Sequence, residues 1–68
     1  MNEMDEIKTI WTKGRLVTAW RVGDRYEVTV LDADKMAYVE GFTRHFADHE
    51  AAADYATSTA QWFDRVVA

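Results

Sequence analysis

Polar and apolar residues alternate along residues 15–31, RLVTAWRVGDRYEVTVL, on both sides of a central Gly-Asp pair. Alternation with a period of two is typical of a β-strand that buries one of its faces. A two-residue loop that begins with Gly suits the turns that join antiparallel strands. The pattern therefore predicts a hairpin in which Val22 lies opposite Arg25 and Val17 lies opposite Val30.

This register divides the hairpin into two faces with different side chains. One face has Arg15, Arg21 and Tyr26 toward its ends. Its centre holds the small aliphatic residues Val17, Ala19, Val28 and Val30. The opposite face holds Leu16, Thr18, Trp20, Glu27, Thr29 and Leu31. Because both faces contain apolar side chains, the use of the second face is the main functional question.

A β-branched run at residues 7–12 predicts a strand before the hairpin, and residues 1–6 are predicted to form a flexible terminus. Lys13 and Gly14 would connect this strand to the hairpin. A two-residue loop places Ile10 opposite Val17. A three-residue loop with Gly14 in a bulge would shift the register by one residue and exchange the faces of the first strand. We favour the two-residue loop.

Residues 36–42 predict a fourth strand after a polar turn at residues 32–35. Pairing Leu31 with Met36 would place Ala37 and Val39 on the small aliphatic face. The same pairing puts Met36, Tyr38, Glu40 and Phe42 on the other face. Gly41 marks a bulge or a bend before residues 43–46.

The last part of the chain, residues 49–67, has the periodicity of an amphipathic helix. Asp48 is a suitable N-cap, and Glu50 in the first turn complements the positive end of the helix dipole. The apolar half of this helix contains several alanines, which permit close approach to a sheet, together with Tyr55 and Phe63. Trp62 and Val66 belong to the same half.

Together these elements predict an α+β fold, a three- to four-stranded antiparallel β-meander packed on one face by a C-terminal α-helix (ββββα). It forms one small domain at residues 7–68. The helix is expected to cover Ile10, Val17, Ala19, Val28, Val30, Ala37 and Val39. The other face would then stay open and bind a partner through Trp11, Leu16, Trp20, Met36, Tyr38 and Phe42. The alternative is that the N-terminal segment or a bent fourth strand folds over this face.

The composition restricts the kind of protein further. The chain has 68 residues, of which 49% are hydrophobic, and it contains no cysteine. Its core must therefore form without disulfides or thiolate-metal sites. No apolar run approaches the ~20 residues of a membrane span, and a cytoplasmic location is the default expectation.

Catalytic motifs are missing from the sequence. It contains no GxSxG, no phosphate-binding glycine loop and no thiol, and its carboxylates are scattered. His45 and His49 have a spacing that two metal ligands on one helix face would show, but a capping Asp48 places His45 outside the helix. We therefore predict two surface histidines, no metal, no cofactor and no small-molecule substrate, and we do not expect an enzyme.

The function most consistent with these features is a small protein-binding module, either a homodimer or an adaptor or inhibitor of a larger partner. Its size and acidity also suit a phage or mobile-element modulator of a host protein. The net charge of −4 argues against non-specific binding to nucleic acid.

Nucleic-acid binding is nevertheless the alternative, because cations and tryptophans occur together in the first three strands. Bases would stack on Trp11 and Trp20. The phosphate-binding residues would be Lys8, Lys13, Arg15, Arg21 and Arg25. In addition, Arg44-His45-Phe46 followed by Glu50-Ala51 resembles the end of the sheet and the start of the helix in the small arm-binding domains of phage-type integrases. This resemblance implies a DNA-binding sheet backed by a helix.

Overall fold

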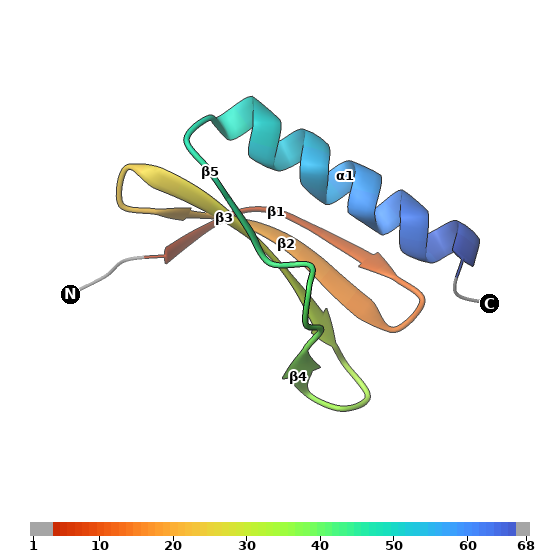
Figure 1. Ribbon diagram of the computed structural model, residues 1–68. Coiled ribbons are helices and arrows are strands. Elements are labelled where there is room, and N and C mark those ends of the chain that lie inside the picture. Colours follow the sequence, from red (N-terminus) through yellow and green to blue (C-terminus); the bar gives the residue numbers. More distant parts are fainter. Residues whose placement is uncertain (1–3, 67–68) are drawn as a thin grey trace.

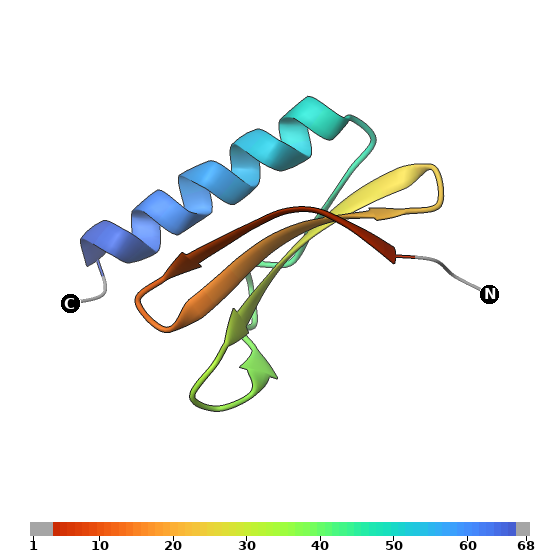
Figure 2. The same ribbon diagram turned by 180° about the vertical axis from the view of Figure 1, so that it is seen from behind.

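The computed structural model describes residues 4–66, which form a curved antiparallel sheet with one helix across it (Figure 1). The elements are β1 (Met4–Thr12), β2 (Arg15–Val22), β3 (Arg25–Asp32), β4 (Ala37–Tyr38), β5 (Arg44–Phe46) and α1 (His49–Val66). The order in the sheet is β1-β2-β3-β4, and β5 pairs with the other end of β3. The helix covers one face and leaves the other uncovered (Figure 2). The α+β fold predicted from the sequence is confirmed.

Both long hairpins have the predicted register. Along β2 and β3, Val22 pairs with Arg25 and Val17 with Val30. Gly23 at the start of that turn has φ +64°, as a type II′ turn requires. Between β1 and β2, Ile10 pairs with Val17, so the two-residue loop is correct and the three-residue alternative is wrong.

β1 differs from the prediction at its beginning. It starts at Met4 rather than at residue 7, and the first three residues of the predicted flexible terminus lie outside the described residues. A β-bulge between Glu6 and Lys8 leaves Ile7 without a partner on β2. Ile7 packs against the core, and Lys8 shares the helix side of the sheet with Ala19.

The predicted fourth strand at residues 36–42 is wrong in length and register. Only Ala37 and Tyr38 form β4, and Leu31 pairs with Tyr38 instead of Met36. The connecting turn has four residues, as predicted, but it lies at residues 33–36 instead of 32–35. The Asp32 carboxylate stabilises it by accepting backbone N–H bonds from residues 34 and 35, at 3.0 and 3.2 Å. Met36 ends this turn with φ +52°.

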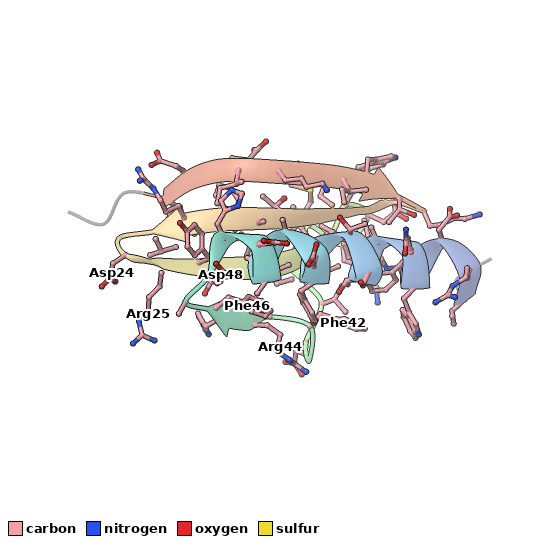
Figure 3. All side chains as sticks on the ribbon, turned by 90° about the horizontal axis from the view of Figure 1, so that it is seen from above. Asp24, Arg25, Phe42, Arg44, Phe46 and Asp48 are labelled. Atoms are coloured by element: carbon pink, nitrogen blue, oxygen red, sulfur yellow. The ribbon has the colours of Figure 1, made fainter. Side chains whose placement is uncertain are left out.

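The chain then bends at Gly41, where φ is +89°, and crosses to the helix side of the sheet. Phe42 and Phe46 both lie along the helix in Figure 3. β5 continues from this crossing and pairs with the beginning of β3, with Phe46 opposite Tyr26. Non-local pairing of this kind joins the segment before the helix to the centre of the fold.

Helix α1 begins as predicted. The Asp48 carboxylate accepts a hydrogen bond from the Ala51 backbone N–H at 3.0 Å, which is the geometry of an N-cap. Small side chains of the helix meet small side chains of the sheet, so the two layers approach closely. Val17, Ala19, Val28, Val30, Ala52 and Ala56 are completely buried.

Larger rings fill one end of this core. Phe63 is buried, and its ring centroid lies 4.9 Å from that of Phe42. The Tyr55 hydroxyl donates a hydrogen bond of 2.8 Å to the Phe42 carbonyl oxygen. Trp62 contacts Phe42 and Phe63 but stays partly exposed. Ile10 and Val39 pack against the core as predicted, whereas Ala37 is exposed and is not covered by the helix.

Candidate functional site

The face of the sheet opposite the helix, called the open face here, has no element of residues 4–66 lying across it (Figures 1 and 2). Strand alternation and the observed registers determine its members. Its apolar and hydroxyl-bearing members are Thr9, Trp11, Leu16, Thr18, Trp20, Thr29, Leu31 and Tyr38, and its charged members at one end are Glu6, Glu27 and His45. Neither the N-terminal part of β1 nor a bent fourth strand folds over them.

Threonines occupy the centre of the open face. The Thr9 and Thr18 hydroxyls are 3.3 Å apart, and the Trp20 indole N–H donates a hydrogen bond of 3.0 Å to Thr29 Oγ1. Thr18 and Thr29 are buried although no helix covers them, because larger neighbouring side chains lie beside them. This arrangement holds the Trp20 ring in a defined orientation on the sheet.

The larger side chains surround a shallow depression of about 270 Å³ above these threonines. Leu16, Trp20 and Leu31 are half-buried. Trp11 and Tyr38, in contrast, keep 60% and 62% of their surface exposed. The open face therefore has an ordered centre and two large aromatic side chains that are largely in water.

Four of the six predicted partner-binding residues lie together on the open face, namely Trp11, Leu16, Trp20 and Tyr38. Met36 is 76% exposed, but it belongs to the turn before β4 and not to the sheet. The prediction for Phe42 is wrong, because the bend at Gly41 carries this residue to the helix side of the sheet.

The polar end of the open face contains a pair that the sequence did not indicate. His45 on β5 pairs with Glu27 on β3, and His45 Nε2 lies 2.7 Å from Glu27 Oε2. The assignment of Glu27 to this face was correct. Its contact with His45 could not be anticipated, because no local pattern shows which strand a three-residue segment will join.

The five cations of the nucleic-acid alternative do not form one surface. Lys13 and Arg15 lie at the turn between β1 and β2, whereas Arg21 and Arg25 lie at the opposite end of β2 and β3. Lys8 lies between the two ends, on the helix side, where its Nζ donates a hydrogen bond of 2.8 Å to Thr57 Oγ1.

Two of these arginines have partners within the fold. The Arg21 guanidinium lies 2.7 Å from the Asp5 carboxylate. The Arg15 guanidinium lies over the Phe63 ring, 5.1 Å from its centroid, and donates a hydrogen bond to the Lys13 carbonyl oxygen. Both arginines are on the helix side of the sheet, opposite the tryptophans, as the predicted register implies.

The two histidines have separate surroundings. His45 pairs with Glu27, while the His49 ring contacts the Tyr26 ring edge-on at a centroid distance of 5.6 Å. Among residues 4–66, no group of three or more His, Asp or Glu side chains gathers in a way that could hold a metal ion.

No protein-family model matches the chain, and the comparisons with curated proteins and with solved structures returned no match either. The integrase resemblance at residues 44–46 and 50–51 therefore stays a prediction. In the part of the chain that the structure describes, no helix is both long and apolar enough to cross a membrane.

Proposed function

We propose that this protein is a non-catalytic protein-binding module whose open face is the contact surface. One observation carries the proposal: Trp11 and Tyr38 are more than half exposed beside the half-buried Leu16 and Leu31, on a face that α1 does not cover. Exposed aromatic side chains that adjoin apolar neighbours are typical of interaction sites. The partner is a second copy of this chain or a larger protein that the module adapts or inhibits.

The distribution of polarity supports this proposal. The centre of the open face is aliphatic, aromatic and hydroxyl-bearing, while the charged residues Glu6, Glu27 and His45 lie toward one end. Many protein interfaces have such an apolar core and a polar rim. A cytoplasmic location remains part of the proposal, and the absence of cysteine suits a reducing compartment.

Self-association is the first measurement. We expect sedimentation equilibrium to show a reversible dimer whose dissociation constant rises at least tenfold in Tyr38→Ser, which corresponds to about 1.4 kcal/mol. Val66→Ser is the matched control, because Val66 is a 57% exposed apolar residue on the helix. An equal loss in both variants would contradict the role of the open face.

Photocrosslinking tests the adaptor form if the free protein is monomeric. Benzoylphenylalanine at position 38 should form a protein adduct in the cells that make this chain, and the same group at position 66 should not. A monomer without a position-specific adduct would contradict the proposal. Salt-sensitive binding of DNA by a monomer would favour the nucleic-acid alternative instead, and Gln substitutions at Arg21 and Arg25 would then have to weaken it.

A further inference from the structure

A second surface lies at the edge of the sheet. Among residues 4–66, β1 pairs only with β2, so its other edge is unpaired over nine residues. The opposite edge of the sheet differs, because β4 and β5 both pair with β3 there. An unpaired edge strand presents backbone donors and acceptors that an incoming strand can use.

The hairpin register shows which backbone groups of β1 are available. In a two-residue hairpin the closing pair, Thr12 with Arg15, exchanges backbone hydrogen bonds, and hydrogen-bonded pairs then recur at every second position. Ile10 and Lys8 therefore direct their backbone groups toward β2. Thr9 and Trp11 direct their N–H and C=O groups outward, where they are free to pair with an added strand.

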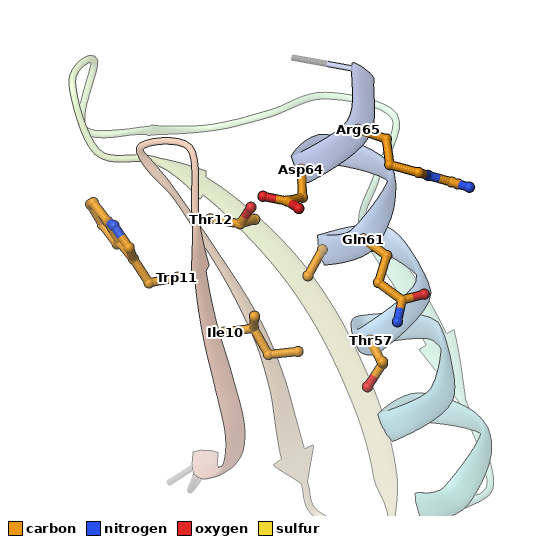
Figure 4. Close-up of a pocket in the computed structure, with 8 residues that line it drawn as sticks. Ile10, Trp11, Thr12, Thr57, Gln61, Asp64 and Arg65 are labelled. Carbon is orange, nitrogen blue, oxygen red and sulfur yellow. The ribbon is translucent and has the colours of Figure 1, made fainter. Parts of the chain in front are cut away.

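A groove of about 480 Å³ runs between this edge and α1 (Figure 4). Ile10 and Ala60 provide its apolar surface, and Thr57 and Gln61 form its wall on the helix. The hydrogen bond from Lys8 to Thr57 joins the strand to the helix beyond Ile10. The Trp11 side chain points to the other side of β1 in Figure 4. Trp11 also borders the groove, which otherwise lies on the helix side of the sheet, away from the open face.

The end of the groove at Thr12 and Asp64 is polar, and neither side chain has a polar partner within residues 4–66. Thr12 is only 8% exposed, and its Oγ1 has no hydrogen-bond partner in the described part of the chain. Figure 4 shows the Asp64 carboxylate directed from the helix toward Thr12, while Arg65 points away. Asp64 forms no ion pair with any residue from 4 to 66. A buried acceptor beside an unpaired carboxylate favours a cationic hydrogen-bond donor.

We infer that this groove binds an extended peptide of another protein, which adds to β1 as an antiparallel strand. Backbone groups of the peptide pair with Thr9 and Trp11. An apolar side chain rests on Ile10 and Ala60, and a Lys or Arg side chain reaches Asp64 and Thr12 Oγ1. Ile10 and Thr12 are two residues apart on the same side of β1, so the two peptide side chains are also two apart. Because the peptide runs antiparallel to β1, its sequence from the N- to the C-terminus is a basic residue, any residue and then an apolar residue.

The acidic character of the chain agrees with this choice of ligand, because a net charge of −4 attracts a basic peptide. The proposal does not depend on the function proposed for the open face. Binding in the groove should persist in Tyr38→Ser and should shift the amides of helix residues 57–65, which lie on the other side of the sheet from the open face.

The test uses a synthetic acetylated and amidated hexapeptide, Thr-Arg-Thr-Leu-Thr-Thr, titrated into the ¹⁵N-labelled full chain. We expect the largest amide shifts at Thr9, Trp11 and helix residues 57–65, and slower hydrogen exchange at the Thr9 and Trp11 amides. Replacing the peptide Arg by Glu should weaken binding at least fivefold. Shifts centred on Thr18 and Thr29 would overturn the groove as the binding site.

Charge exchange makes the test specific. Asp64→Asn should weaken binding of the Arg peptide at least fivefold, and Asp64→Arg should reverse the preference in favour of the Glu peptide. Asp24→Asn is the matched control, since it removes the same charge at the opposite end of the sheet and should leave affinity within twofold. Absence of binding at millimolar peptide would overturn the proposal. Concentration-dependent protection of the Thr9 and Trp11 amides from hydrogen exchange, seen without peptide and unchanged in Tyr38→Ser, would overturn it in favour of edge pairing between two copies.

Discussion

The two faces of the β2–β3 hairpin belong to the same strands but differ in how much of their side-chain surface is buried. On the helix side, Val17, Ala19, Val28 and Val30 are completely buried. On the open face, directly behind them, Leu16, Trp20 and Leu31 are only half-buried, and Trp11 beside them is mostly exposed. The helix side of the sheet thus has the smaller side chains and the open face the larger ones.

This difference follows from how a helix packs on a sheet. Small side chains on both layers, such as Val28 and Ala56, permit close approach and leave few voids. Tryptophan at these positions would hold the helix away from the sheet. Large side chains can instead remain on a surface that no second layer covers. Side-chain size, more than hydrophobicity alone, distinguishes the two faces.

The strongest test of this comparison places a charge on each face in turn. Val28→Asp should abolish cooperative folding, because an unpaired carboxylate would enter a completely buried site. Trp11→Asp should retain a sharp thermal transition, since that side chain is mostly in water. Circular dichroism melting of both variants measures the difference. A normal transition in Val28→Asp would show that the faces have been assigned the wrong way round.

Aromatic truncation on the helix gives the next largest effect. Phe63→Ala should lower the free energy of unfolding by about 3–5 kcal/mol, because it opens a cavity beneath Phe42 and Arg15. Trp62→Ala, its neighbour, should cost only about 1 kcal/mol, mainly lost ring contacts. Urea denaturation of the two variants provides the comparison. Equal losses would mean that Trp62 is as much a part of the core as Phe63.

Removing the N-cap of α1 destabilises the helix that covers one face of the sheet and leaves the side chains of the open face unchanged. Asp48→Ala should cost about 1 kcal/mol through the lost bond to the Ala51 N–H. For a domain of this size the melting temperature should fall by roughly 4–8 °C. Asp48→Ser retains an acceptor and should restore most of the loss. If Ser and Ala behave alike, the hydrogen bond does not contribute to stability.

The smallest expected effect is a gain at the turn that determines both faces of β1. Lys13 has φ +49° and Gly14 has φ +78°, the pattern of a type I′ turn, which prefers Asn-Gly. Lys13→Asn should therefore raise the free energy of unfolding by about 0.5–1 kcal/mol. Chemical denaturation measures this gain, and NMR should show Ile10 still opposite Val17. Destabilisation would indicate that the Lys13 side chain contributes more than its backbone strain costs.

The candidate site was only partly predictable, for a geometric reason. The pairings Leu31–Met36 and Leu31–Tyr38 differ by two residues and therefore send the same residues to the same faces. Hydrophobic alternation cannot distinguish them, so Tyr38 was placed correctly while the strand was not. The position of this turn, one residue later than predicted, depends on backbone hydrogen bonds to Asp32, which alternation does not report.

Local signals in the sequence by themselves determined the β2–β3 hairpin with its turn, the two faces of that hairpin and the start of the helix at Asp48, and they favoured the two-residue loop between β1 and β2. Each depends on residues within a few positions, or on a period of 2 or 3.6. Only the tertiary structure decided the bulge at Glu6, the crossing of Phe42 beneath the helix, the pairing of β5 with β3 and the groove between β1 and α1. These features join segments far apart in the chain, and competition among many possible contacts selects them.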